Sequence, residues 1–269
     1  MHPPSSSPRT SSVVALCCSV ILIHVWSAGL VASASRPKAP STPRPPAVVI
    51  GITGGFVRHD NQVHGVVQFA ERLRRDFPEG TCVEVFENHR WQQALQEIEK
   101  RLDADHDGKL SPEEKREARI VLYGHSWGGS EVVHLAGELG NKGLPVLLTV
   151  QVDSVAKPGE DSSLIPANVA EAVNFYQQDG WLHGRAEIRA ADPAHTKILG
   201  NFRREYKSSS CPGYPWYNRW FTVPHCAIEI DPEVWDRAET LIRGALQEPT
   251  GLPDEQGRGT VRAPAGNGR

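Results

Sequence analysis

The pentapeptide GHSWG at residues 124–128 places a serine between two glycines, after an apolar run and before a helix-like segment. A sharp strand-to-helix turn of this type holds a serine in strained backbone geometry and exposes its hydroxyl at a sheet edge. The positions two before and two after the serine must then lack bulk, and Gly124 and Gly128 meet this condition. Free amides at the start of the following helix would favour negative charge near the hydroxyl. The pattern predicts that Ser126 is a nucleophile; the alternative is a serine in an ordinary tight turn.

A serine nucleophile needs a base and an orienting acid, which in this setting follow in the order Ser, Asp or Glu, His. Asp153 ends the next apolar run, LLTVQVD, so its carboxylate is expected at the same sheet edge as Ser126. His225 lies in FTVPHC, which we expect to be a loop just before the last helix. Asp179 and then Asp192 are the alternatives for the acid. The remaining candidate bases are expected mid-helix, beyond a far strand or pointing away from the serine: His134, His89 and His125.

The stabilisation of an oxyanion requires two backbone amides, one after the nucleophile and one after the first strand. These positions correspond to Trp127 and, in the segment GITGGFVRHDN, to Phe56. The alternative for the second segment is a plain glycine turn.

The elements that must position these groups follow from alternating apolar runs and helical patterns. Strands are predicted at 47–53, 81–87, 119–125, 145–152 and near 171–177. Helices are predicted at 63–76, 91–102, 128–140 and 231–247, the last opening with Asp231-Pro232 as an N-cap and a first-turn proline. Strand–helix alternation predicts an α/β fold, a doubly wound and mostly parallel sheet with helices on both faces.

With these residues, the chain from about 47 to 247 resembles the α/β-hydrolase superfamily, of the lipase and esterase kind. In most of that superfamily the acid follows the strand after next, which corresponds to Asp179. In pancreatic-type lipases it follows the strand next to the nucleophile, in a G-L-D-P motif that QVDSV resembles, so Asp153 is preferred. The usual His-Gly of the oxyanion loop is here Gly54-Gly55, which removes a side chain but no amide.

The resemblance implies a serine hydrolase that cleaves carboxylic esters of small molecules or lipids. Thioester or amide cleavage would use the same groups, and a non-catalytic binding module on a hydrolase scaffold is the alternative from another class. No large cap domain fits between Asp153 and His225. The aromatic residues that precede the histidine could line an acyl or aryl pocket or cover the core: Tyr214, Trp216, Tyr217, Trp220 and Phe221.

A second motif, LDADHDGKLSPEE, fits the calcium loop of an EF-hand at residues 103–114. Three short carboxylates and a backbone carbonyl would surround one side of a hard cation, a glycine would allow the bend, and a glutamate would close the other side. The expected ligands are Asp103, Asp105, Asp107, Lys109 through its carbonyl, Ser111 and Glu114. Because no second hand is visible to pair with it, we expect a structural Ca²⁺ site; a regulatory Ca²⁺ site and an acidic solvated loop are the alternatives.

The N-terminal residues differ from the rest. Residues 1–34 combine Arg9, an apolar run and a terminal ASA, which predicts a cleaved signal peptide and a secreted or periplasmic protein. The alternative is an uncleaved segment that anchors the protein in a membrane. A proline-rich linker is expected at 35–46, the hydrolase domain at 47–248 and a disordered tail at 249–269.

Export determines how the cysteines are interpreted. Cys17 and Cys18 would leave with the signal, so Cys211 and Cys226 could close a short loop while Cys82 stays a buried thiol. Other pairings of these three remain open. Loss of Arg9, the one charged residue of 1–34, changes the formal net charge from −3 to −4, and no basic stripe remains, so nucleic acid is not expected as a partner.

Overall fold

The computed structural model describes residues 46–77, 80–159, 161–206, 210–216 and 222–247. These lie in the second of two units into which the chain divides, residues 42–269. The predicted signal peptide, all but the last residue of the predicted linker and the predicted tail fall outside the described residues.

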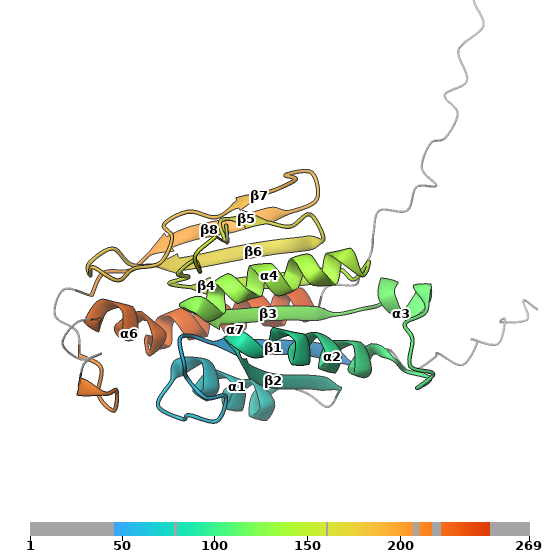
Figure 1. Cartoon of the computed structure of the whole chain (residues 1–269), viewed down its shortest axis with the longest axis horizontal. Helices are drawn as coiled ribbons and strands as arrows, with labels where there is room; N and C mark the ends of the chain where they lie inside the picture. The colour runs from blue at the N-terminus through green and yellow to red at the C-terminus, as the bar shows by residue number, and fades with distance from the viewer. Residues whose placement is uncertain (1–45, 78–79, 160, 207–209, 217–221, 248–269) are drawn as a thin grey trace, which may run out of the picture. The chain divides into compact units, whose positions relative to one another are not determined.

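The centre of the domain is a six-stranded sheet in which every neighbouring pair of strands is parallel. Its order is β2-β1-β3-β4-β6-β8 (Figure 1). The strands are β1 (Ala47–Thr53), β2 (Thr81–Glu87), β3 (Ile120–His125), β4 (Val146–Val152), β6 (Val169–Tyr176) and β8 (Lys197–Arg203). Two short strands, β5 (Leu164–Ile165) and β7 (Arg189–Ala190), form a separate pair.

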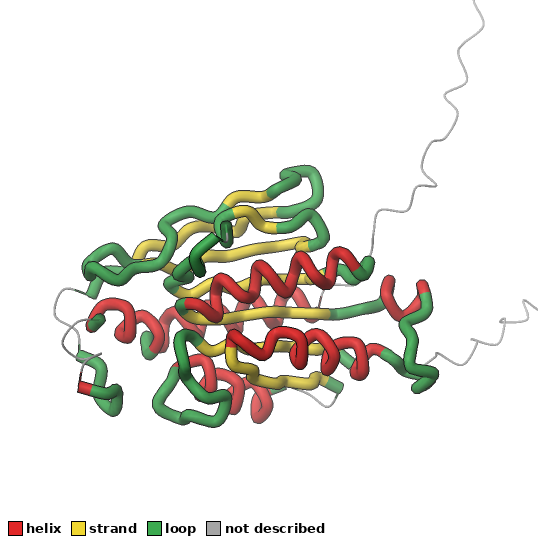
Figure 2. Tube along the Cα trace, viewed as in Figure 1, coloured by secondary structure: helices red, strands yellow, loops and turns green. Residues whose placement is uncertain are grey.

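Helices cover both faces of this sheet, as the red and yellow segments of Figure 2 show. One core joins the sheet to α1 (Gly65–Asp76) and α7 (Pro232–Gln247), and another joins its opposite face to α2 (Trp91–Leu102) and α4 (Trp127–Asn141). Shorter helices are η1 (Asn88–Arg90), α3 (Pro112–Arg116) and α6 (Val223–Glu229). The predicted fold class, a doubly wound parallel α/β sheet, is confirmed.

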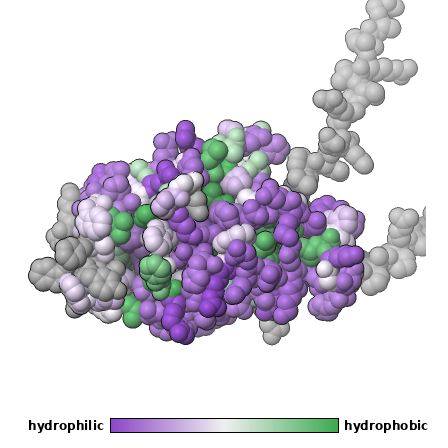
Figure 3. Space-filling model, in the orientation of Figure 1, coloured by the Kyte–Doolittle hydropathy of each residue, from purple (hydrophilic) through white to green (hydrophobic). Residues whose placement is uncertain are grey.

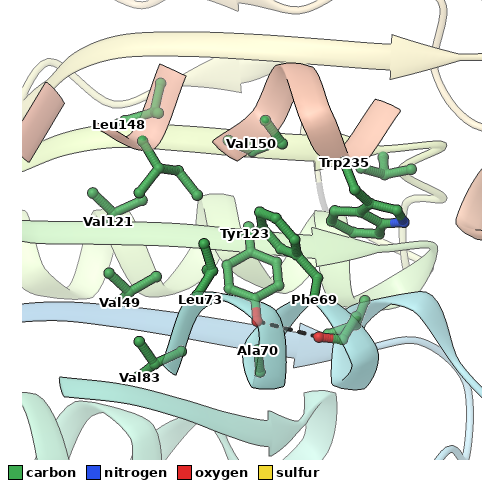
Figure 4. Close-up of a cluster of buried hydrophobic side chains, with 14 of the residues drawn as sticks. Val49, Phe69, Ala70, Leu73, Val83, Val121, Tyr123, Leu148, Val150 and Trp235 are labelled. Atoms are coloured by element: carbon green, nitrogen blue, oxygen red, sulfur yellow. Dashed lines mark hydrogen bonds between the residues drawn. The ribbon is translucent and has the colours of Figure 1, made fainter. Parts of the chain in front are cut away.

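The apolar runs of the central strands β1, β3 and β4 are nearly continuous because these strands are covered on both faces. In β1, Val48, Ile50 and Ile52 pack against α2 and α4, whereas Val49 packs on the opposite face with α1 and α7. Figure 4 shows the core formed with α1 and α7, where Tyr123 is fully buried. Its hydroxyl donates to the carbonyl of Val66, 3.2 Å away, so burial of the ring leaves no unpaired polar atom.

The short elements η1, β5 and β7 were not predicted, and neither were two longer ones, β8 and α6. Strand β8 carries Gly200 within KILGNFR, and its pairing with β6 is irregular at Ala172/Val173, so its sequence lacks a clean alternation. Helix α6 spans 223–229, where we expected a loop, and its seven residues are too few to give a helical repeat. Helix α1 starts at residue 65 rather than 63 because His64 is its N-cap.

The face of the molecule drawn in Figure 3 is mostly hydrophilic, with small separate apolar patches. Within the described ranges, no helix combines the length and apolar character needed to cross a bilayer.

Candidate active site

Ser126 occupies a strained turn between β3 and α4. Its backbone angles are φ 58° and ψ −127°, a conformation that side-chain-bearing residues rarely adopt. A β-carbon on Gly128 would overlap the carbonyl of Ile52 in the neighbouring strand, and one on Gly124 would overlap the backbone of Gly128. The two glycines are therefore required by the close approach of β1, β3 and α4, as the sequence predicted.

The structure brings the predicted serine, histidine and acid into one chain of contacts. His225 Nε2 lies 2.9 Å from Ser126 Oγ, and His225 Nδ1 lies 2.6 Å from Asp153 Oδ2. Because an ionised carboxylate only accepts, the proton of the neutral ring belongs on Nδ1, which leaves Nε2 to accept from the serine hydroxyl. His225 comes from α6, while the other two follow β3 and β4 at the same edge of the sheet.

Asp153 is fully buried and surrounded by donors. Oδ1 accepts from the amides of Gln177 (3.2 Å) and Gly184 (2.8 Å), and Oδ2 accepts from the Gln177 side chain (2.8 Å) and from His225. Burial alone would raise the pKa of Asp153, but the hydrogen bond and charge of His225, together with Gln177 and Gly184, lower it below the ordinary value. The carboxylate therefore remains ionised.

The two alternative acids lie in other surroundings. Asp179 accepts from the amide of Tyr206 at 2.6 Å and lies 3.4 Å from Arg203, while Asp192 accepts from the amide of Ala194 and from His195. Neither has a described contact with His225. Of the three carboxylates considered from the sequence, Asp153 is the one within hydrogen-bonding distance of the imidazole.

The predicted oxyanion segment follows β1 and turns back at residues 54–57. Thr53 Oγ1 donates to the carbonyl of Val57 at 2.7 Å, and Asn88 Nδ2 donates to that of Gly55 at 2.5 Å, which together fix the turn. The rings of Phe56 and Trp127 meet edge to face with centroids 5.8 Å apart. Both residues line a cavity of about 600 Å³ with Ser126 and His225.

Aromatic side chains border this cavity. Tyr214, one of its lining residues, is buried, while Phe56 is 92% exposed. Trp181, which is 74% exposed, directly precedes the lining residue Leu182. Trp216, which is 64% exposed, directly follows the lining residue Pro215. The rest of the predicted aromatic group, Tyr217, Trp220 and Phe221, lies outside the described residues.

Helix α6, which carries His225, is tied to the preceding segment by a disulfide between Cys211 and Cys226. This is the pairing considered most favourable from the sequence. Cys82 is a free cysteine and is only partly buried, so the expectation of a buried thiol was too strong; it lies on β2, which is an edge strand of the sheet.

Sequence reasoning missed a second group of polar side chains behind His225. We expected His125 to point away from the site, but its Nε2 lies 3.0 Å from the carbonyl oxygen of His225 and the two rings are 4.5 Å apart. Its Nδ1 lies 3.2 Å from Oε2 of Glu229, which is buried. Glu229 is four residues after His225, one helical turn, but this spacing carries no signal unless α6 is known to be a helix.

The predicted calcium loop brings some of its carboxylates together. Asp103, Asp105 and Glu114 place one oxygen each within 4.8 Å of one another. Asp107 is not in this group, and it accepts instead from the amide of Lys109 at 2.7 Å. Glu114 also forms a capping box with Ser111 at the start of α3. Asp103 Oδ2 accepts from the amide of Gly108, whose φ of 81° makes the bend.

Comparisons with known proteins give similarities of fold. No protein-family model matches the chain, and no curated protein matches it. Among solved structures, it is similar to a candidate hydrolase of the alpha/beta superfamily from Xanthomonas campestris pv. campestris, with 15% identity over 54% of this chain and 85% of that one, at a TM-score of 0.34. It is also similar to RedJ, a thioesterase from the prodiginine biosynthetic pathway of Streptomyces coelicolor (11% identity, 80% and 98% coverage, TM-score 0.35). Est1E from Butyrivibrio proteoclasticus gives 13% identity, 77% and 90% coverage and a TM-score of 0.38.

The burial of His125 makes acid stability a test of this site. Burial lowers the pKa of His125 from its ordinary 6.5 to about 4, against the opposing charge of Glu229. Between these two pH values, His125 binds a proton in the unfolded chain but stays neutral in the folded chain. The free energy of unfolding should therefore fall by roughly 3 kcal/mol as pH drops from about 6.5 to 4. Urea unfolding across this range should show a clearly smaller loss in His125→Gln.

The matched control is His89→Gln, because the His89 side chain is exposed and has no hydrogen-bond or ion-pair partner among the described residues. It should leave the pH dependence of unfolding unchanged. An identical acid loss in the wild type and in His125→Gln would mean that His125 does not titrate in this way.

Proposed function

We propose that this protein is a serine hydrolase that cleaves carboxylic esters. The observation that carries the proposal is the continuous contact chain from Ser126 through His225 to Asp153. The strained backbone of Ser126, the ionised Asp153 and a cavity beside the hydroxyl support the same conclusion. A serine that is only part of a tight turn would not require an imidazole and a buried carboxylate in line behind it.

In the proposed reaction, His225 Nε2 takes the proton of Ser126 Oγ as this oxygen attacks the ester carbonyl. Asp153 accepts from Nδ1 and stabilises the imidazolium that forms, without taking its proton. The amides of Phe56 and Trp127 are the proposed donors to the oxyanion. His225 then protonates the leaving alcohol, and water attacks the acyl-enzyme by the same route, which regenerates Ser126.

The cavity supports an ester with an apolar acyl or aryl portion, because aromatic and aliphatic side chains line or border it. Small-molecule and lipid esters both fit this description. Thioesters and amides can be cleaved by the same groups, so parallel assays with a nitrophenyl ester and its thioester and anilide analogues separate these substrate classes. A non-catalytic binding module is the alternative from another class.

A fluorophosphonate probe tests the proposed nucleophile. It should label the wild type, and Ser126→Ala should abolish the labelling. Asp153→Asn should slow ester hydrolysis by about 10⁴-fold because the imidazole loses its orienting acceptor. Asp179→Asn, the matched control, should stay close to wild type. A folded wild type that never labels would favour the binding module, and a larger loss in Asp179→Asn would transfer the role of the acid.

We also propose that the loop at 103–114 binds Ca²⁺ as a structural ion. Asp103, Asp105 and Glu114 supply the grouped carboxylates, and oxygen ligands are those that Ca²⁺ prefers. The loop connects α2 to α3, close to the start of the strand that leads to Ser126. A bound ion would neutralise the mutual repulsion of these carboxylates and hold that connection in place.

Calcium binding predicts a shift in thermal stability. EDTA should lower the melting temperature of the wild type, and added Ca²⁺ should restore it, because an ion that binds only the folded state stabilises that state. Asp103→Ala should remove the response, whereas Asp60→Ala, at an exposed acid outside the loop, should retain it. Equal melting temperatures of the wild type with EDTA and with Ca²⁺ would contradict the proposal.

Export is proposed from residues 1–34 alone. N-terminal sequencing of the mature protein should begin at or near Ser35. An N-terminus at Met1 in the mature protein would exclude cleavage and leave the anchored form.

A further inference from the structure

The side chain of Glu229 is a buried carboxylate in the wall of the candidate active site, and the proposed reaction does not use it. It is 3% exposed and lines the same cavity as Ser126 and His225. Three groups from separate parts of the chain surround it: His64, the N-cap of α1, at 3.1 Å; His125, at the end of β3, at 3.2 Å; and the hydroxyl of Tyr214 at 2.7 Å. A buried carboxylate is costly unless it is paired and hydrogen-bonded, and these three partners meet that requirement for Glu229.

Glu229 remains ionised despite its burial. Burial alone would raise its pKa, but the charge of His125 and the hydrogen bonds of His64 and Tyr214 lower it to about 2. The site therefore holds a second negative charge, in the cavity wall, in addition to that of Asp153, which is fully buried behind His225. The other charged group among the cavity-lining residues is Arg58, which is exposed and paired with Asp60.

His125 connects this carboxylate to the base. One ring nitrogen faces Oε2 of Glu229 and the other faces the carbonyl oxygen of His225. Both neighbours are acceptors, so a neutral ring donates to one of them at a time and an added proton gains a second hydrogen bond. The His125 ring also lies against the ring of His225, with centroids 4.5 Å apart.

Glu229 and His225 are also linked through their backbone. They lie one helical turn apart on α6, and the Trp235 indole donates to the carbonyl of Glu229 at 2.6 Å. A β-carbon on Gly65 would overlap this same carbonyl, so α1 and α6 meet at backbone contact. The backbone contacts of Glu229 therefore hold α6 against α1 and α7.

We propose that Glu229 is a positioning residue for His225: through His125 it fixes the helix that carries the base, and its negative charge favours the protonated form of that base during the reaction. Among the described residues, the ionisable groups that face Glu229 are His64, His125 and Tyr214. In the same part of the chain, Asp153 and His125 face the His225 ring, and the Ser126 hydroxyl contacts its Nε2. Glu229 thus acts on the same imidazolium as Asp153. Asp153 contacts the His225 ring directly, whereas Glu229 acts through one intervening residue, His125. This inference rests on the proposed hydrolase function.

The test is Glu229→Gln, which keeps the shape of the side chain and removes its charge. The variant should lower kcat by about tenfold with little change in KM, because the charge stabilises the imidazolium formed in the transition state. The acid limb of the pH profile of kcat/KM should move to lower pH by about half a unit or more, because His225 loses its proton more readily without the neighbouring negative charge.

Tyr214→Phe is the matched control. It removes one hydrogen bond from Glu229 and keeps the charge, so it should lower the melting temperature while the acid limb stays in place. If Tyr214→Phe and Glu229→Gln move the acid limb equally, or if folded Glu229→Gln keeps the wild-type kcat and acid limb, the proposal is wrong.

A second variant covers the case in which Glu229→Gln does not fold. His125→Asn retains a donor toward Glu229 and loses the one toward the His225 carbonyl, so kcat should fall without a matching rise in KM; a wild-type kcat would overturn the proposal.

NMR titration of the His225 imidazole, assigned with His225→Gln, separates this inference from the proposed function. In folded Glu229→Gln, the His225 imidazole should titrate at lower pH, even in a protein that is inactive on esters. In His125→Asn, its signal should show a changed line shape during the titration. Unchanged titration of His225 in both variants would overturn the inference.

Discussion

The candidate site depends on one imidazole that is held between two groups from different strand ends. His225 reaches Ser126 with one nitrogen and Asp153 with the other, at 2.9 and 2.6 Å. These distances require α6 to lie within a narrow range of positions, because a displacement of 1 Å breaks one contact or the other. Most of the unusual features near the site restrict that position: the disulfide at Cys226, the carbonyl contact of His125 and the buried carboxylate of Glu229.

The parallel sheet supplies the other half of the geometry. Ser126 and Asp153 follow adjacent strands, β3 and β4, so both emerge at the carboxyl edge of the sheet. Ser126 is kept in its strained conformation by the packing of α4 against β1, which leaves no room for a β-carbon at Gly128. The turn at 54–57 follows β1 at the same edge, and therefore lies beside the serine without any long-range loop.

The sequence predicted the parts of this arrangement that follow from local patterns. The strand–turn–helix around Ser126 and the apolar runs of β1, β3 and β4 were visible because both faces of these strands are buried, and β2 was visible from its alternation of buried and partly buried residues. The spacing of Asp153 after β4 was sufficient to place it, since parallel strands share an edge. Helix α6 and strand β8 were not visible, because seven residues give no helical period and Gly200 interrupts the alternation. Glu229 was missed for a related reason: its role depends on contacts with His64, 165 positions away, that no local pattern records.

The most direct test of the central claim is the covalent intermediate. The protein can be mixed with a nitrophenyl ester, quenched in acid during turnover and digested, and its peptides can be measured by mass spectrometry. The account predicts that the acyl group is found on the peptide containing Ser126. Ester turnover with the acyl group on another residue, or with no acylated peptide under conditions that trap the intermediate, would contradict it.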